Sequence, residues 1–260
     1  MTERHGHDAL PHIRFDTRCV VLPLGVMIAV LSLAHLLSQV AKFRLGIPSA
    51  YGLVDLFDMD VEANFPTYLA GVQLLLCSLV LTVIALVCRQ TKDRFAKHWL
   101  VLAVIFLAIS ADELVSVHEL SIRLGREFAP TFATGIFYWI WIVPGSVLVL
   151  LIAFMYAEFV FAYLPPLVRN RTIIGAILFV GGALGVEMFE ARHVEQHGME
   201  NLTMGFFVLF EETLEKVGIL VFLSGLLEYM RTVVGSVVVD VMHGSKSGLA
   251  PSANPAQRKR

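Results

Sequence analysis

The sequence predicts an all-α integral membrane protein in which six transmembrane helices form one bundle. Hydrophobic residues make up 57% of the chain and charged residues only 16%, and the mean hydropathy is +0.72. This composition differs strongly from that of a soluble globular domain. Two segments, 65–88 and 129–157, contain no charged residue, and about 20 apolar residues suffice to cross a bilayer. Basic residues gather in alternate connections between the apolar segments, as expected for a multi-pass protein.

The predicted spans differ in how polar they are. The first, 19–40, is interrupted only by His35 and by small or amide side chains, and it is too long for the core of a signal peptide. The second and fourth are the two charge-free segments. The third, fifth and sixth combine an apolar run with ionisable residues, and they cover 99–124, 172–197 and 204–227. We expect those ionisable residues to face the interior of the bundle rather than lipid.

The distribution of Lys and Arg predicts the orientation. These residues are concentrated in the tails and in the connections at 89–97 and 169–171, whereas the alternate connections hold Lys42, Arg44, Arg123 and Arg126. By the positive-inside rule, both termini are expected in the cytoplasm. We therefore expect a polar cytoplasmic segment at 1–18, a transmembrane domain at 19–240, and a cytoplasmic tail at 241–260 with the composition of a disordered segment.

In this orientation the ionisable residues of three helices fall at one depth, in the outer half of the membrane. They are Asp112, Glu113, His118 and Glu119 on the third helix, Glu187, Glu190 and His193 on the fifth, and Glu211, Glu212 and Glu215 on the sixth. So many carboxylates cannot all stay ionised in a low-dielectric interior without compensation. We expect them to take up protons, to pair with Arg192 and Lys216, or to bind cations.

Divalent metal is the compensation that the residue types favour. Glu190-x-x-His193 has the carboxylate–imidazole spacing of di-metal carboxylate bundles, and this mixture of ligands suits Zn, Fe or Mn. We expect one or two ions, bound by ligands drawn from Asp112, His118, Glu119, Glu190, His193, Glu211 and Glu215. Glu113, Glu187 or Glu212 would then act as the general base for a bound water. The second Glu-x-x-His of a full di-iron pattern is missing, because Ser116 follows Glu113 at that spacing.

A structural explanation competes with this one. A single buried His or Glu is more often a hydrogen-bonded packing element than a ligand. If the third and fifth helices end earlier than predicted, Glu119, Glu195 and His197 are ordinary solvated helix ends. Ionisable residues clustered within a membrane are nevertheless functional by default, which favours a functional site for the set as a whole.

The connection before the second span allows several interpretations. Asp58, Asp60, Glu62 and Asn64 alternate as in a calcium loop, but the glycine and the distal glutamate of an EF-hand are missing. Asn64 equally suits the start of a helix, because Phe65-Pro66-Thr67 follows it. Since the connection lies at the outer mouth of the ionisable set, it could instead form a lid.

Three motifs, "ADELVSVHEL", "FDMDVEANFPTYL" and "LFEETLEKVG", resemble an uncharacterised group of bacterial multi-pass membrane proteins with DE...HE, DxExNxPT and EExxE patterns. The resemblance covers most of residues 50–230 and implies the fold and a location in a bacterial plasma membrane. His193 and His197 together with Asp112, Ser116 and His118 are also similar to the zinc site of alkaline ceramidase-like hydrolases, which however have seven spans and another order of motifs.

These observations predict a metal-dependent membrane enzyme, a hydrolase or an oxidoreductase, that acts on a lipidic or other apolar substrate. Membrane lipids are the expected partners, and nucleic acid is not. A proton- or cation-coupled transporter is the alternative. It needs polar residues across the inner half, but 99–109 and 172–186 contain no ionisable residue. A haem protein would use two of His35, His118, His193 and His197.

Overall fold

The fold is an all-helical bundle with six helices long and apolar enough to cross a membrane, which confirms the predicted fold class. The computed structural model describes residues 16–116, 127 and 132–235, and these contain no strand. Most of the two predicted tails lies outside the described residues. The six spans are Arg18–Arg44, Phe65–Gln90, Ala96–Val115, Ile142–Tyr163, Pro166–His197 and Leu202–Val234.

Three spans correspond to single helices, and the other three join several elements. The first three are α1 (Arg18–Arg44), α3 (Phe65–Gln90) and α4 (Ala96–Val115), with the short α2 (Leu53–Phe57) between α1 and α3. The fourth joins α6 (Ile142–Glu158) to a π-helical turn, η3 (Phe159–Tyr163). The fifth joins α7 (Pro166–Val180), the π-helical turn η4 (Gly181–Val186) and α8 (Glu187–His197). The sixth is α9 (Leu202–Tyr229) followed by η5 (Met230–Val234).

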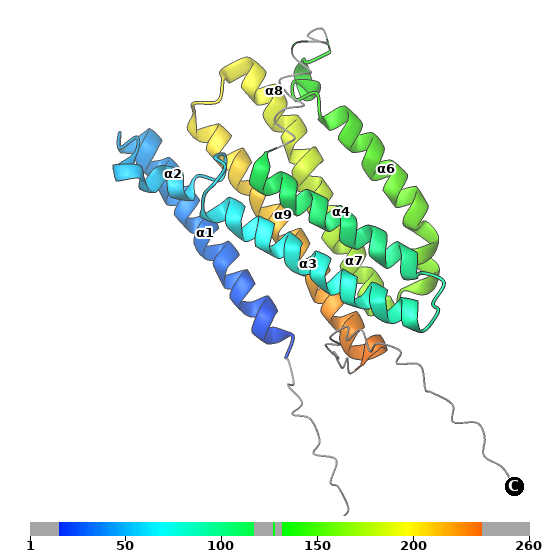
Figure 1. Cartoon of the computed structure of the whole chain (residues 1–260). Coiled ribbons are helices and arrows are strands. Elements are labelled where there is room, and N and C mark those ends of the chain that lie inside the picture. The colour runs from blue at the N-terminus through cyan, green and yellow to red at the C-terminus, as the bar shows by residue number, and fades with distance from the viewer. Residues whose placement is uncertain (1–15, 117–126, 128–131, 236–260) are drawn as a thin grey trace, which may run out of the picture.

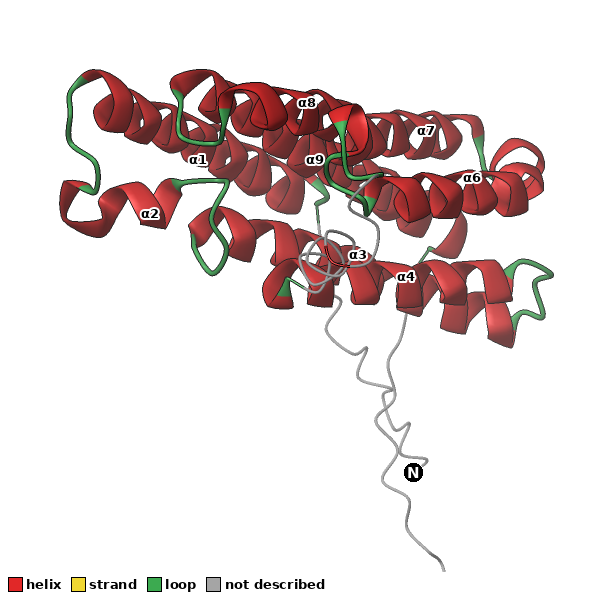
Figure 2. Ribbon diagram, turned by 90° about the horizontal axis from the view of Figure 1, so that it is seen from above, coloured by secondary structure: helices red, strands yellow, loops and turns green. Residues whose placement is uncertain are grey.

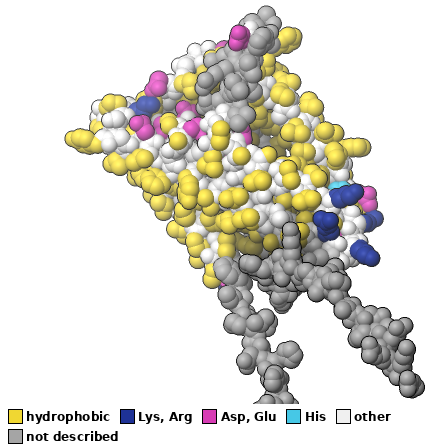
Figure 3. Space-filling model, viewed as in Figure 1, with side chains coloured by type: hydrophobic (Ala, Val, Ile, Leu, Met, Phe, Trp, Pro, Cys, Tyr) yellow, Lys and Arg dark blue, Asp and Glu magenta, His cyan; other side chains and the backbone are white. Residues whose placement is uncertain are grey.

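Helix α9 lies at the centre of the bundle and packs against α1, α3, α7 and α8 (Figure 1). The α3–α4 hairpin forms a layer of its own against the remaining helices (Figure 2). We call the end of the bundle that carries α2 the α2 end. The opposite end, where α1 begins and α9 finishes, is the terminal end. Hydrophobic side chains cover the flank between the two ends, and Lys and Arg gather near the α3–α4 turn at the terminal end (Figure 3).

Two predicted spans have different boundaries in the structure. The third was expected to continue to residue 124, but α4 ends at Val115, because Ser116 adopts a left-handed conformation with φ of 57°. The fourth was expected to begin at residue 129, but the helix begins only at Ile142. Thr134 is extended and Gly135 has φ of 60°, so the chain before Ile142 cannot continue as one helix.

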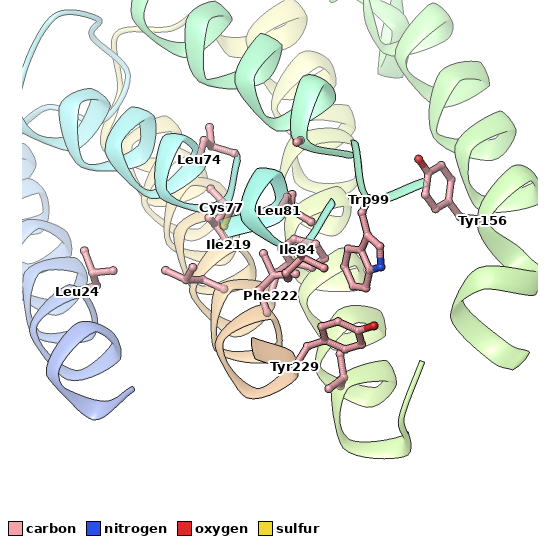
Figure 4. Close-up of a cluster of buried hydrophobic side chains, with 14 of the residues drawn as sticks. Leu24, Leu74, Cys77, Leu81, Ile84, Trp99, Tyr156, Ile219, Phe222 and Tyr229 are labelled. Atoms are coloured by element: carbon pink, nitrogen blue, oxygen red, sulfur yellow. The ribbon is translucent and has the colours of Figure 1, made fainter. Parts of the chain in front are cut away.

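The terminal half of the bundle is filled by apolar and aromatic side chains. Leu81 of α3 and Ile219 and Phe222 of α9 are buried between the helices (Figure 4). Further toward the terminal end, the rings of Trp99 and Tyr229 pack with centroids 4.7 Å apart. This packing holds α3, α4 and α9 together and leaves the ionisable residues to the other half.

Candidate functional site

Glutamates from three helices lie in the half of the bundle nearer the α2 end. Together with one lysine they form a set that we call the carboxylate chamber: Glu113 of α4, Glu187 and Glu190 of α8, and Glu211, Glu212, Glu215 and Lys216 of α9. Glu212 lies ten residues after Leu202, which begins α9. At 1.5 Å per residue this is about 15 Å from the helix start.

Glu212 interacts electrostatically with most of the other residues of the set. Its charge acts on side chains of α4, α8 and α9, namely Glu113, Glu187, Glu190, Glu215 and Lys216. Glu212 also forms an ion pair with Lys216, one helical turn further along α9. Lys216 is only 1% exposed, and a buried ammonium group needs such a partner. Lys216 therefore compensates the charge of Glu212. The other glutamates of the chamber need another form of compensation.

A pair of carboxyl groups connects α8 to α9. The carboxyl groups of Glu190 and Glu211 lie within hydrogen-bonding reach of each other. A hydrogen bond between two carboxyl groups requires a proton on one of them, so this pair is suited to hold a proton between the helices. Glu190 is 4% exposed, and its Oε1 has no hydrogen-bond partner among the described residues.

Neighbouring segments position the glutamates of α8 and α4. The indole of Trp141, just before α6, donates a hydrogen bond to Oε1 of Glu187 over 2.7 Å. The hydroxyl of Ser110 donates to the carbonyl of Gly71 over 2.8 Å, which fixes α4 against α3 one turn before Glu113. The first contact joins segments 46 residues apart in the sequence, and the second joins the two helices of the α3–α4 hairpin.

Gly182 in the π-helical turn η4 shapes the contact between η4 and α9. A side chain at Gly182 would place its Cβ 2.8 Å from the carbonyl oxygen of Glu211 and 2.8 Å from Cγ of Glu215. Only glycine therefore lets the two helices approach this closely. Single π-helical turns inside longer helices are frequent at functional sites, and η4 directly precedes Glu187.

The glutamates of the chamber differ in burial. The Glu212 side chain is 23% exposed, and Glu113, Glu187, Glu211 and Glu215 are half-buried, whereas Glu190 is buried.

Sequence analysis missed Gln73, which lies at the edge of this set. Gln73 of α3 is 0% exposed and its Nε2 lies 3.4 Å from the carbonyl of Lys216, to which it donates. Its Oε1 has no hydrogen-bond partner among the described residues. The signal for it was a lone amide in an otherwise apolar span, because buried polar groups in membranes are costly.

The connection before α3 is held in place by His35. The backbone N–H of Met59 donates to Nδ1 of His35 over 2.9 Å, so Nε2 carries the proton and donates to the carbonyl of Gly205 over 3.0 Å. Asp58 lies 3.4 Å from the same ring. Both ring nitrogens are thus engaged within the protein, which disfavours His35 as a haem ligand.

The side chain of Asn64 caps α3, as one of the sequence interpretations predicted. Its Oδ1 accepts from the backbone N–H of Thr67 over 3.2 Å, and its Nδ2 donates to the carbonyls of Asp55 and Asp58. Nearby, the pKa of Asp60 is raised to about 6, first by desolvation and then by the charges of Asp58 and Glu212. Asp60 therefore links this connection electrostatically to the chamber.

His193, the histidine of the predicted ligand set that the structure describes, has its partners near the end of α8. Nε2 of His193 lies 2.9 Å from Oδ1 of Asn201, and its ring stacks on that of His197 near the end of α8. Thus Glu190 and His193, although three residues apart, make contacts with different partners. His118 and Glu119 lie outside the described residues. The charge of Asp112 acts on the carboxyl group of its neighbour Glu113. Arg192 is exposed on α8.

The described residues do not form a ready metal site. Within the described ranges, no three His, Cys, Asp or Glu side chains are arranged to hold a metal ion. The ionisable side chains that the structure places in the chamber are six carboxyl groups and the Lys216 ammonium group, while the predicted ligands His118 and Glu119 lie outside the described residues. Metal binding, like the likeness to di-metal bundles and to alkaline ceramidase-like hydrolases, stays a prediction.

Comparison with known proteins places the chain in a family. No curated protein and no solved structure shows detectable similarity to it. A family model described as a domain of unknown function, DUF8692, matches residues 23–229. The match extends from α1 to the end of α9 and includes every member of the carboxylate chamber. The chain therefore belongs to the DUF8692 family.

Proposed function

We propose that this protein is an integral membrane enzyme that acts on a lipidic substrate, with the carboxylate chamber as its active site. The supporting observation is the concentration of acidic side chains from α4, α8 and α9 around Glu212 in one half of an otherwise apolar bundle. Ionisable groups in a membrane are costly, so a set this large points to function rather than to stability.

The chamber offers groups for general acid–base chemistry. Glu190 and Glu211 can share a proton, so one of them can donate a proton to a leaving group while the other accepts one. Glu113 and Glu187 approach Glu212 from two other directions, and either can act as a base on a water molecule. Lys216 keeps a positive charge beside Glu212, where it can stabilise negative charge that develops on a substrate.

The orientation in the membrane is part of the proposal. Lys and Arg near the α3–α4 turn favour a cytoplasmic terminal end, in a bacterial plasma membrane. The chamber then lies in the outer half. The fifth and sixth spans have 32 and 33 residues and are about 50 Å long, against a hydrocarbon core of about 30 Å. Glu212 would then lie a few ångströms inside the outer edge of the hydrocarbon region, within reach of lipid head groups.

Transport across the bundle is the less favoured function. A relay of protons or cations requires polar groups along the whole path. In the described terminal half, the core between α3 and α9 is made of apolar side chains such as Leu81, Ile219 and Leu223, each at most 3% exposed. The chamber thus ends against apolar packing, as an active site open to one side would.

The experiment compares lipids before and after incubation with the enzyme. The purified chain is reconstituted into nanodiscs made from total bacterial lipid, and the lipid species are quantified by mass spectrometry over time. Wild type should consume at least one species, and Glu212→Gln should slow this at least 100-fold, because it removes the charge on which the chamber is centred. Glu228→Gln is the matched control, since Glu228 lies on the same helix but pairs with Arg231 near the terminal end.

Two results would contradict the proposal. One is an unchanged lipid profile with wild type together with ion flux into proteoliposomes that Glu212→Gln abolishes. The other is equal turnover by wild type and a folded Glu212→Gln variant. Repeating the reaction with a chelator tests the metal requirement separately, because the proposed acid–base groups need no metal.

A further inference from the structure

Lys and Arg side chains gather on the turn between α3 and α4, at the terminal end of the bundle (Figure 3). Residues 89–97 have the sequence RQTKDRFAK, with four basic residues and one acidic residue. The four basic side chains are all exposed, and we call them the basic patch: Arg89, Lys92, Arg94 and Lys97. The patch presents a dense positive charge to the surroundings of the protein.

The acidic residue of the turn is directed into the protein. Oδ1 of Asp93 accepts from the backbone N–H of Phe95 over 2.7 Å, and its Oδ2 accepts from the hydroxyl of Tyr163 over 2.8 Å. The hydroxyls of Tyr163 and Tyr229 lie 2.7 Å apart, which continues these hydrogen bonds to the end of α9. The carboxylate of Asp93 is thus engaged with neighbouring segments, while the basic side chains around it stay exposed.

Most side chains of the basic patch lack a charged partner. Arg89, Lys92 and Lys97 form no ion pair with any of the described residues. Arg94 lies 3.4 Å from a carboxylate oxygen of Glu158, and both of these side chains are 68% exposed. Ion pairs this exposed are weak and can exchange partners. The patch is therefore free to bind an anion from outside the protein.

Two other basic residues of the terminal end are engaged within the protein instead. Nη1 of Arg169 donates to the carbonyl of Phe161 over 3.3 Å, and Nη1 of Arg171 donates to the carbonyl of Ser224 over 3.0 Å. Positive charge at this end thus falls into two groups, and the α3–α4 turn carries the group without internal partners.

Aromatic packing fixes the backbone of the turn. Phe95 is 4% exposed, and its ring lies against the rings of Phe159 and Tyr163 with centroids 5.5 and 4.5 Å apart. The hydroxyl of Tyr156 donates to the carbonyl of His98 over 3.0 Å. Because these contacts hold the turn against η3, less conformational entropy is lost when the basic side chains bind a ligand.

The turn lies at the level of lipid head groups. Helix α3 ends at Gln90 and α4 begins at Ala96, and both are long and apolar enough to cross a membrane. The 20 residues of α4 are about 30 Å long, which matches the thickness of the hydrocarbon core. The segment between the two helices therefore meets the membrane surface, where the phosphates of lipid head groups carry the negative charge.

We propose that the basic patch binds an anionic phospholipid through the phosphate of its head group. Charge complementarity selects a lipid with net negative charge over a zwitterionic one, because the cationic group of the latter is repelled by the same side chains. Clusters of about four to eight Lys or Arg residues beside a membrane span bind anionic lipids by this attraction. The basic patch and the carboxylate chamber lie in opposite halves of the bundle, so the inference is independent of the proposed function.

The test is competition between two lipids that differ in charge. The full chain is purified in mixed micelles with equal amounts of phosphatidylglycerol and phosphatidylcholine, and native mass spectrometry measures the lipids it retains. Wild type should retain phosphatidylglycerol at least about fivefold over phosphatidylcholine, and the double variant Lys92→Gln/Lys97→Gln should lower this ratio at least about threefold.

The matched control is Arg169→Gln/Arg171→Gln. It removes the same charge from the same end of the bundle, and glutamine can still donate to the backbone carbonyls that the two arginines contact. This variant should keep the wild-type ratio. Equal losses in the two double variants would assign the preference to total charge and overturn the inference.

Two further results would also overturn it, namely a wild type without a preference and an unchanged ratio in Lys92→Gln/Lys97→Gln. Arg89→Gln is a second variant, a single exposed substitution that keeps the test decisive if the double variant fails to fold. It should lower the ratio in the same direction, and an unchanged ratio in a folded Arg89→Gln variant would then contradict the inference.

Discussion

Individual residues determine how charged side chains are compensated inside this bundle. Lys216 is buried and keeps its charge beside Glu212, while Gln73 contacts the backbone at the same level. The charge of Glu212 on α9 acts on the carboxyl group of Glu113 on α4 and on that of Glu190 on α8. The presence of ionisable residues at this depth could be predicted from their positions along the helices. Gln73 left only the weaker signal of a lone amide in an apolar span, and Trp141 left none, because neutral side chains give no charge pattern.

Asp60 predicts a pH dependence of stability. The pKa of Asp60 is raised to about 6 in the folded protein by desolvation and by Asp58 and Glu212, whereas an unfolded Asp ionises near pH 4. The folded state therefore holds this proton more tightly, and the stability it contributes is present below pH 4 and is lost as the pH rises through 6. Asp60→Asn should match wild type in thermal unfolding at pH 4 and exceed it at pH 7.5.

The control for Asp60 is Asp55→Asn, because Asp55 is an aspartate of the same connection, on α2. This variant should follow wild type at both pH values. A constant difference in unfolding temperature between Asp60→Asn and wild type across the pH range would contradict the assigned origin of the shift.

Elements set the distances between these residues. The π-helical turn η4 lies between α7 and α8 and directly precedes Glu187, and a π-helical turn changes the rotational position of every residue that follows it. Helix phase computed from the sequence alone assumes a regular α-helix. Glu190 and His193 both follow η4, so the turn changes their position relative to α7 and not relative to each other; their side chains make contacts with Glu211 and with Asn201. Likewise, no proline or glycine stands next to Val115 in the sequence to predict that α4 ends there.

Gly182 tests the close approach of η4 and α9. In Gly182→Ala the new Cβ would meet the backbone oxygen of Glu211 at 2.8 Å, so the helices must separate. Overpacking of this kind costs about 1–3 kcal/mol. Gly181→Ala is the control, since a Cβ there meets nothing within 4 Å and alanine favours the helix. Thermal unfolding in detergent should show a loss for Gly182→Ala and no loss for Gly181→Ala. Equal effects would contradict the packing described for η4.

The whole molecule divides into an apolar terminal half and a half that holds the carboxylate chamber. The count and order of the six spans could be predicted, because the length of an apolar run determines whether it crosses a membrane. Which helices are neighbours could not be predicted. The central place of α9, which brings Glu212 close to Glu113 and Glu190, depends on packing against α1, α3, α7 and α8 that no local pattern encodes.

The central claim is that side chains of α4 and α9, distant in sequence, act as one site around Glu212. A double-mutant cycle with Glu113→Gln and Glu212→Gln tests this directly by measuring the free energy of unfolding of the two single variants and the double variant. Interacting charges should give a coupling of about 1 kcal/mol or more, whereas independent sites add within about 0.5 kcal/mol. The cycle of Glu113→Gln with Glu228→Gln should be additive. Additivity in both cycles would contradict the account.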